Sequence, residues 1–249
     1  FDTNVLEISG VTDQDDKPLS FALGLEESSL GRPLLVDIND EVTRVKIDYK
    51  TSPEAEALQW LSAQQTAGEQ MPFLFTQSQA ILCRSWIPIQ DSPGIRITYQ
   101  ARVKVPEGML ALMSATNPTE KNNTGEYEFA MRQPIPAYLM ALAVGDIDYA
   151  PISDRTGVYA EPSVLKPAAW EFEEMETMVQ AAEELYGDYA WEVYDLIVLP
   201  PSFPFGGMEN PRLTFATPTI LAGDRSLTSL VAHELAHSWS GNLVTNATW

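Results

Sequence analysis

The sequence has 249 residues, of which 45% are apolar and 20% charged; this composition excludes bulk disorder and leaves room for one large domain or two ordinary ones. Asp and Glu number 35 against 15 Lys and Arg, and the net charge of −20 argues against nucleic acid and anionic membranes as partners. Cys83 is the only cysteine and no run of about eighteen apolar residues occurs, so we expect no intramolecular disulfide, no membrane span and a cytoplasmic location.

Residues 1–146 are predicted to form a mostly antiparallel β-domain with the character of a saddle or sandwich. Apolar and polar residues alternate at 45–49 and 95–105, which is typical of half-buried strands. Further strands are expected at 127–131 and 138–144, with turn-forming Pro, Gly and Asn residues between the strands. Successive strands of this kind assemble most simply as antiparallel sheets.

Residues 147–249 are predicted to begin a second domain in which helices join the strands. A strand is expected at 157–161, and apolar residues from Phe172 to Leu185 recur at helical spacing until Gly187. The glutamates at 171–176 are interpreted as the solvated first turns of this helix, where the helix dipole favours negative charge. A buried strand at 195–199 then leads into a stiff proline-rich segment and a second extended stretch at 213–218.

The final predicted helix carries the only two histidines, His233 and His237. Ser226 is expected to cap this helix, whose apolar positions span 227–239. Positions i and i+4 share one face of a helix, so both imidazoles can bind one metal ion, and zinc suits imidazole better than calcium or magnesium does. Glu234 is the candidate general base for a water that attacks a carbonyl group.

A catalytic zinc site needs three protein ligands, so the two histidines leave one ligand to be found. The metzincin pattern would place glycine at 240 and histidine at 243, and Ser240 and Leu243 exclude that class. Residues 238–249 contain no Asp, Glu, His or Cys. The third ligand is therefore either an upstream carboxylate or a residue outside this chain. A helix with two incidental histidines is the plain structural alternative.

Two motifs together resemble a known family. Gly-Gly-Met-Glu-Asn at 206–210, followed by His-Glu-Leu-Ala-His at 233–237, is similar to the paired signature of the gluzincin zinc aminopeptidases, the aminopeptidase-N family. The sequence most resembles the leukotriene hydrolase/aminopeptidase branch of that family. Further stretches that carry the resemblance are residues 57–61, 77–80, 199–205 and 238–245. The resemblance implies an α+β fold, in which the β-domain precedes the first part of a thermolysin-like catalytic domain.

The resemblance also implies a role for each matched residue. His233 and His237 would bind one Zn²⁺ ion, and Glu234 would be the catalytic base. Glu209 would hold the free α-amino group of a peptide substrate. The other matched positions would bind substrate, with the two glutamines in the first specificity pocket: Gln77, Gln79, Ala80, Gly206, Gly207, Met208 and Asn210. Glutamine at 79 fits the branch, whereas Phe205 stands where the branch often has tyrosine.

The implied activity is zinc-dependent removal of N-terminal residues from peptides, with hydrolysis of a leukotriene-type epoxide as a second activity. The family's third zinc ligand and catalytic tyrosine would follow Trp249, so the chain is expected to be a fragment. Two alternatives stay open. A thermolysin-type endopeptidase is disfavoured by Glu209 and the glycine pair, and a non-catalytic binding or structural module is favoured by the missing ligand.

Overall fold

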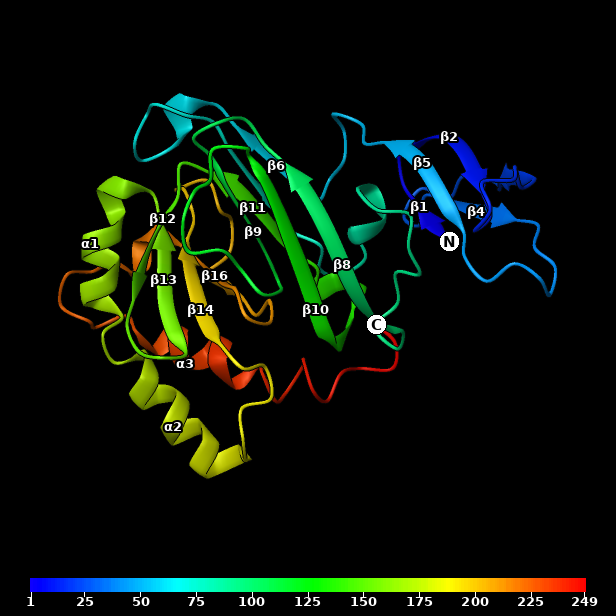
Figure 1. The fold of residues 1–249 in the computed structure, drawn as a ribbon. Coiled ribbons are helices and arrows are strands. Elements are labelled where there is room, and N and C mark those ends of the chain that lie inside the picture. Colours follow the sequence, from blue (N-terminus) through cyan, green and yellow to red (C-terminus); the bar gives the residue numbers. More distant parts are fainter.

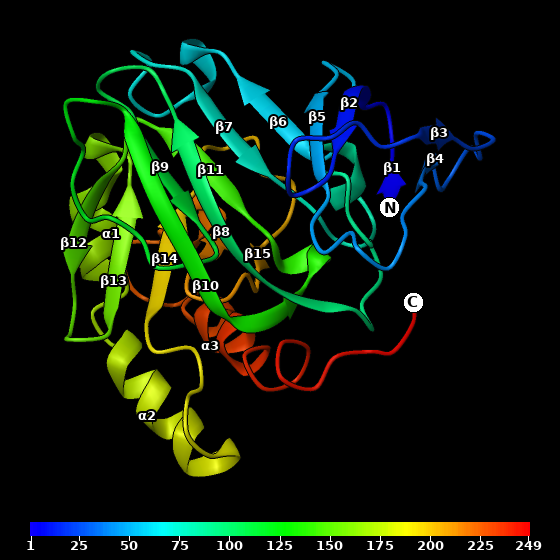
Figure 2. The ribbon, with the colours of Figure 1, turned by 45° about the vertical axis from the view of Figure 1, so that its right-hand side comes forward.

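The computed structural model describes all 249 residues, which form five sheets and three α-helices (Figure 1). The chain begins with two small antiparallel sheets that lie together around the N-terminus (Figures 1 and 2). One sheet has the strand order β1-β4-β3, and the other pairs β2 with β5. Their strands are β1 (Asp2–Thr3), β2 (Glu7–Thr12), β3 (Phe21–Leu23), β4 (Arg32–Val36) and β5 (Lys46–Lys50).

The next six strands occupy the centre of the molecule. Four of them form an antiparallel sheet in the order β6-β7-β11-β9, and the two longest, β8 and β10, pair with each other beside it (Figure 2). The strands are β6 (Leu58–Leu61), β7 (Phe73–Thr76), β8 (Arg96–Lys104), β9 (Leu110–Met113), β10 (Glu126–Pro136) and β11 (Leu142–Gly145). β7 ends directly before Gln77, and this sheet therefore brings the predicted specificity residues toward the interior.

The last five strands form one mixed sheet in the order β12-β13-β14-β16-β15. β13, β14 and β16 run parallel, and an antiparallel strand flanks them on each edge. Every residue of β13 and β14 is buried, as expected for parallel strands covered on both faces. The strands are β12 (Asp148–Pro151), β13 (Thr156–Ala160), β14 (Tyr194–Val198), β15 (Gly207–Met208) and β16 (Thr214–Ala216).

Three α-helices accompany this mixed sheet, and all belong to the second half of the chain. They are α1 (Pro162–Glu171), α2 (Met175–Tyr186) and α3 (Ser229–Ala236). α1 packs against β12 and β13, while α3 contacts both α2 and β15 (Figure 2). Short 3-10 helices occur at Ala63–Gln65, Cys83–Ser85, Ala137–Leu139 and Pro218–Ile220. None of the helices combines the length and apolarity required to cross a membrane.

Most strands predicted from alternation are confirmed. β5 and β8 overlap the predicted stretches 45–49 and 95–105 to within one residue at each end, and half-buried and exposed residues alternate along β8. β13 and β14 likewise confirm the strands predicted at 157–161 and 195–199. The prediction at 138–144 is partly wrong, because residues 137–139 form a buried 3-10 helix and the strand begins only at Leu142. A continuous apolar run does not by itself distinguish a strand from a buried helical turn.

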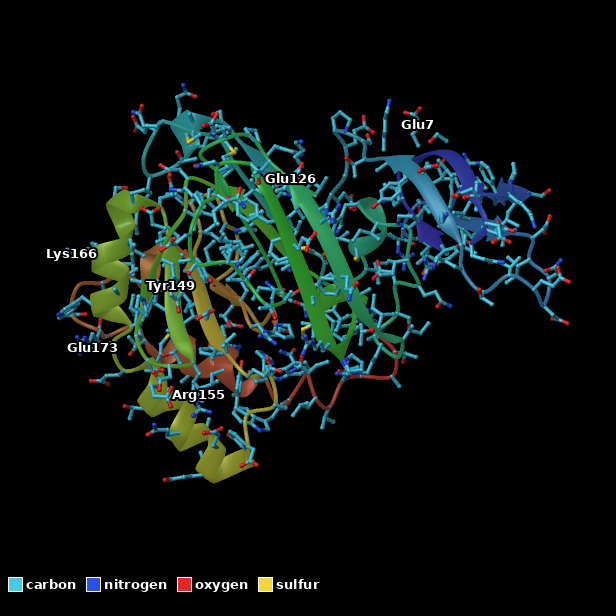
Figure 3. All side chains as sticks on the ribbon, viewed as in Figure 1. Glu7, Glu126, Tyr149, Arg155, Lys166 and Glu173 are labelled. Carbon is cyan, nitrogen blue, oxygen red and sulfur yellow. The ribbon has the colours of Figure 1, made fainter.

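The acidic stretch at 171–176 differs from the prediction. It is divided between two helices, and Glu171 ends α1 with only 2% of its surface exposed. Its two carboxylate oxygens accept hydrogen bonds from the backbone N–H groups of Gly223 (2.9 Å) and Arg225 (2.8 Å). Burial without these donors would be costly, so Glu171 anchors the loop that leads to α3. Glu173, in contrast, lies at the surface as predicted (Figure 3).

α2 confirms the predicted amphipathic helix and its end at Gly187, whose φ of +89° suits glycine. Glu176 of this helix is not free in solvent, because Arg155 pairs with both Glu176 and Glu183, at N–O distances of 3.0 and 2.7 Å. This pairing lowers the pKa of Glu183 to about 2. α1 was not predicted from the sequence; it begins with Pro162 and contains Pro167, which removes one helical hydrogen bond.

The helix that carries the histidines is shorter than predicted. Ser226 does not cap it, because 226–228 form a turn and the N-cap is Thr228. The helix ends at Ala236, so Trp239 lies in the following turn rather than on the helix. The indole N–H of Trp191 donates to the Ser238 carbonyl (3.0 Å), which gives this carbonyl a partner outside the helix.

One hydrophobic core of 49 buried residues runs from Ala57 to Leu235 through both halves of the chain. The sheet composition changes between Gly145 and Asp148, next to the domain boundary predicted at residue 146. Because the core is continuous across this point, the division into domains 1–146 and 147–249 stays a prediction. The continuity has a functional consequence, since it holds the end of β7 against the segment that contains β15.

Candidate active site

His233 on α3 and His237, the C-cap residue that continues its last turn in helical conformation, lie on one face. Their Nε2 atoms are 3.2 Å apart. Two nitrogen ligands of one tetrahedral zinc ion, each about 2.0–2.1 Å from the metal, stand about 3.3 Å from each other. The helical i, i+4 spacing therefore produces the separation that a shared zinc ion requires.

A hydrogen bond fixes the ring of His237. Its Nδ1 lies 2.9 Å from the carbonyl oxygen of Ser240, and because a carbonyl only accepts, Nδ1 carries the proton. Nε2 then keeps its lone pair and points toward His233. Backbone carbonyls commonly orient metal-binding histidines in this way. The donor set and its orientation fit a zinc ion.

Glu234 lies on the same helix but is turned inward, with 5% of its surface exposed. One of its carboxylate oxygens, Oε2, has no hydrogen-bond partner in the protein. The pKa of Glu234 is raised to about 7, chiefly by burial and secondarily by the nearby Glu209 carboxylate, while His237 opposes the shift. A buried carboxylate with a free oxygen and a pKa near neutrality has the properties of a general base.

Gly207 gives Glu234 its space. β15 pairs with β16 so that Gly207 lies opposite Ala216, and this places the glycine directly against the Glu234 side chain. A Cβ atom at Gly207 would lie 2.3 Å from Oε1 of Glu234 and 2.5 Å from its Cδ. Any side chain at 207 would therefore displace the carboxylate. The neighbouring Gly206 is less constrained, since its Cβ would lie 3.3 Å from Leu230.

Glu209 follows β15 and is also buried, with 8% exposure. Ligand atoms of Glu209, Glu234 and His237 all lie within 4.8 Å of one another. Two carboxylates and an imidazole from segments 25 residues or more apart along the chain thus share one small volume. The Glu209 side chain is available to a cation that enters this volume.

The residues expected at the specificity pocket arrive from β7. Gln77 is buried, and its amide Nε2 lies 3.4 Å from the sulfur of Met208. Gln79 is half-buried and Ala80 is exposed. Asn210, also buried, has a side-chain amide nitrogen without a protein partner. The structure thus brings Gln77 next to the 206–210 segment, while the binding roles of these residues stay predictions.

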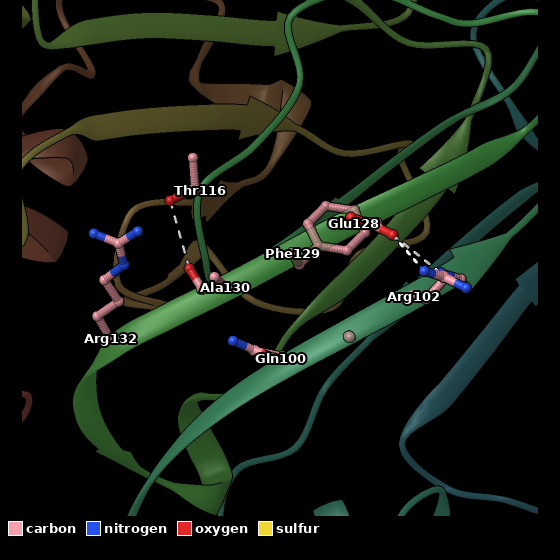
Figure 4. A pocket seen from close by; sticks show the side chains of 8 residues that line it. Gln100, Arg102, Thr116, Glu128, Phe129, Ala130 and Arg132 are labelled. Atoms are coloured by element: carbon pink, nitrogen blue, oxygen red, sulfur yellow. Dashed lines mark hydrogen bonds and ion pairs between the residues drawn. The ribbon is translucent and has the colours of Figure 1, made fainter.

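A cavity of about 690 Å³ opens beside the helix face. Its lining includes Phe205, Gly207, Ile220, Leu230, His233 and Glu234. Ile220, with its neighbours Thr217 and Thr219, comes from the turn after β16 and was not expected from the sequence, which shows only an extended stretch there. A second hollow, of about 660 Å³, lies over β8 and β10, where Arg102 pairs with Glu128 (Figure 4). It contains none of the predicted site residues.

Comparison with known proteins relates both halves of the chain to one peptidase family. Residues 3–139 match the peptidase M1 N-terminal domain, and residues 170–249 match the peptidase family M1 domain. Leukotriene A-4 hydrolase from Xenopus laevis is 49% identical over 258 residues, covering 100% of this chain and 42% of that protein. Aminopeptidase B from Rattus norvegicus is 48% identical over 207 residues, covering 83% of this chain and 32% of that protein.

Solved structures show the same relationship. Native leukotriene A4 hydrolase from Saccharomyces cerevisiae superposes with a TM-score of 0.92 at 40% identity, covering 100% of this chain and 39% of that chain. An M1 zinc metallopeptidase from Deinococcus radiodurans shares the fold with a TM-score of 0.77 at 23% identity, covering 100% of this chain and 57% of that chain. The predicted fold class, an antiparallel β-region before the first part of the catalytic domain, is thereby confirmed.

The chain spans about 40% of the length of the first two curated relatives that it matches, with coverage of 42% and 38%. A family match that covers more than half of the chain, together with relatives near 50% identity over its whole length, establishes the family. The chain belongs to peptidase family M1, in the branch that contains leukotriene A-4 hydrolase and aminopeptidase B.

Proposed function

We propose that these residues form part of the active site of a zinc-dependent aminopeptidase, which removes N-terminal residues from peptides with a free amino group. The observation that carries this proposal is the buried Glu209 carboxylate, within 4.8 Å of the ligand atoms of Glu234 and His237. In a peptide the α-amino nitrogen is only about 2.5 Å from the first carbonyl carbon. A carboxylate this close to the metal helix therefore suits the amine of a substrate whose first carbonyl group is attacked.

The proposed metal is one Zn²⁺ ion held by the Nε2 atoms of His233 and His237. The third ligand is proposed to lie outside these 249 residues, because Glu209 and Glu234, the nearest carboxylates, have other proposed roles. When bound, zinc polarises the substrate carbonyl and lowers the pKa of water. The proposal is supported by the 3.2 Å separation of the two nitrogens and by the Ser240 carbonyl that orients His237.

Each of the other residues has one proposed task. Glu234 takes the proton of the attacking water and delivers it to the departing amine. Gly206 and Gly207 offer backbone groups to the substrate chain, and Gln77 with Gln79 lines the pocket for the first side chain. Two features from the sequence remain predictions: a cytoplasmic location and the absence of nucleic-acid partners.

Replacement of Glu209 tests amine recognition. We expect Glu209→Ala in the whole protein to lower kcat/KM for aminoacyl arylamides about 100-fold, because a hydrogen bond to a charged group contributes up to about 3 kcal/mol. Steady-state kinetics on leucyl p-nitroanilide measures the effect. Glu107→Ala, at an exposed glutamate between β8 and β9, is the matched control. An unchanged kcat/KM in Glu209→Ala would contradict the assignment.

The two alternatives make different predictions for the same protein. An endopeptidase of thermolysin type would cut an N-acetylated peptide as readily as a free one, whereas the proposed aminopeptidase would leave it intact. A non-catalytic module would bind zinc weakly and turn over neither peptide. Product analysis on the paired peptides, together with the zinc content, distinguishes all three functions.

A second activity, hydrolysis of a leukotriene-like lipid epoxide, is proposed on two observations. The first is the 49% identity with the protein named leukotriene A-4 hydrolase. The second is the apolar part of the cavity beside His233 and Glu234, where Phe205, Ile220 and Leu230 can contact an aliphatic chain. Incubation with an allylic fatty-acid epoxide should yield an enzymatic diol, and only the products of spontaneous hydrolysis would refute this activity.

A further inference from the structure

Asn242 lies in the turn after the metal helix and is 1% exposed. Its side-chain nitrogen Nδ2 donates a hydrogen bond to the backbone carbonyl of Glu209 (2.8 Å). Its own backbone N–H donates to the carbonyl of His237 (3.0 Å). Asn242 therefore connects His237 with Glu209, which lies 33 positions before Asn242 in the chain.

The turn that holds Asn242 is itself fixed from the N-terminal half of the chain. The guanidinium group of Arg96, at the start of β8, donates to the carbonyl of Asn242, to Thr245 Oγ1 (2.6 Å) and to the carbonyl of Pro134 (3.1 Å). Tyr138 adds a hydrogen bond to the Gly241 carbonyl (3.3 Å). With these contacts from β8 and from the 3-10 helix at Ala137–Leu139, the turn is a rigid support rather than a free loop.

The amide at 242 uses its donor in this arrangement, while its Oδ1 is buried and has no partner in the protein. The atom that the donor meets is a carbonyl oxygen, so the side chain must donate and must have the length of asparagine. An aspartate would place an acceptor against an acceptor, and an alanine would leave the Glu209 carbonyl buried without its partner. Neither replacement removes the backbone hydrogen bond to His237, so the histidine geometry and the tether to Glu209 can be separated experimentally.

We propose that Asn242 is a positioning residue for recognition of the substrate's amino terminus, since it fixes the Glu209 backbone at a set distance from the metal helix. The inference rests on the proposed function, because it takes Glu209 as the group that binds the amine. Without the tether, the 209–210 backbone gains freedom and the carboxylate no longer stands where an α-amino group bound beside the metal requires it. Supporting residues of this kind typically change affinity 10–100-fold.

Two hydroxamates measure this effect directly. Leucine hydroxamate and its des-amino analogue, 4-methylpentanohydroxamate, bind the metal through the same group and differ only in the α-amine. The Ki ratio is the Ki of the des-amino compound divided by that of leucine hydroxamate. We expect Asn242→Ala to lower this ratio at least about tenfold from wild type, because leucine hydroxamate binds more weakly. Affinity for the des-amino compound, and zinc affinity in a chelator competition, should stay close to wild type.

Asn117→Ala is the matched control. The Asn117 side chain also donates to backbone carbonyls, those of Met113 (2.8 Å) and Ala115 (3.2 Å), but it lies between β9 and β10. It should lower the melting temperature and leave the Ki ratio unchanged. Asn242→Asp should reproduce the loss seen with alanine, because it keeps the volume and removes the donor.

The ratio does not depend on the fraction of folded protein, since both inhibitors bind the same molecules. If neither Asn242 variant yields folded protein, Arg96→Gln decides: a lowered ratio supports the proposal and an unchanged ratio overturns it. An unchanged ratio in folded Asn242→Ala also overturns it. A wild-type protein that does not distinguish the two hydroxamates would instead refute the proposed amine recognition by Glu209.

Discussion

Glu234→Gln is expected to lower kcat/KM for aminoacyl arylamides about 1,000-fold without unfolding the protein, because it removes the proposed general base. Glutamine has nearly the same size, so it fits the space against Gly207, but its amide cannot take a proton from water. The wild-type carboxylate is suited to that task because it is buried, has one oxygen without a protein partner and has a pKa raised to about 7.

The measurement combines steady-state kinetics with zinc content and thermal unfolding. Since His233 and His237 remain, the variant should still bind zinc. Glu184→Gln on α2 makes the same chemical change at an exposed glutamate and serves as the control. Activity of Glu234→Gln within tenfold of wild type, in a zinc-loaded and folded protein, would show that another group is the base.

Gly207→Ala is expected to lower kcat about 100-fold while destabilising the fold by about 1–3 kcal/mol. The new Cβ atom would lie 2.3 Å from Oε1 of Glu234, closer than any real contact of this kind, so the carboxylate must move. Overpacking of a buried site accounts for the loss of stability, and a shift of about 1 Å in a catalytic group accounts for the loss of rate. The expected signature is a large fall in kcat with a modest change in melting temperature.

Gly10→Ala provides the comparison for this prediction. Gly10 also lies in a strand, β2, but a Cβ there would meet only Asp48 Oδ2, at an ordinary 3.6 Å. That variant should therefore keep wild-type kcat. If Gly207→Ala keeps its kcat as well, the position of Glu234 against β15 does not control the rate, and the role assigned to glycine at 207 is wrong.

Local patterns in the sequence predicted the parts of the fold that depend on near neighbours. The alternation in 95–105 predicted β8 because successive side chains of a strand face opposite sides. The spacing of His233 and His237 predicted a shared helix face for the same kind of reason, and the structure places their nitrogens 3.2 Å apart. The resemblance of two motifs also led to the family without any structural information.

Patterns of this kind were less reliable where distant parts of the chain determine the local conformation. Glu171 had the appearance of a solvated helix residue, but the loop at 223–225 folds over it and donates two backbone hydrogen bonds to its carboxylate. Similarly, α3 ends earlier than its apolar spacing predicts, because the following turn has partners on β8 and in the 3-10 helix at Ala137–Leu139.

The sequence by itself predicted the chemistry, since two imidazoles and a carboxylate in one His-Glu-x-x-His segment are typical of a zinc hydrolase wherever that segment lies. Only the tertiary structure decided that the Glu209 carboxylate comes within 4.8 Å of Glu234 and His237. Two contacts between separate segments accompany that proximity, since α3 packs against β15 and Asn242 donates a hydrogen bond to the Glu209 carbonyl. Spacing along one helix is set by backbone geometry, whereas distances between segments are set by packing of the whole core.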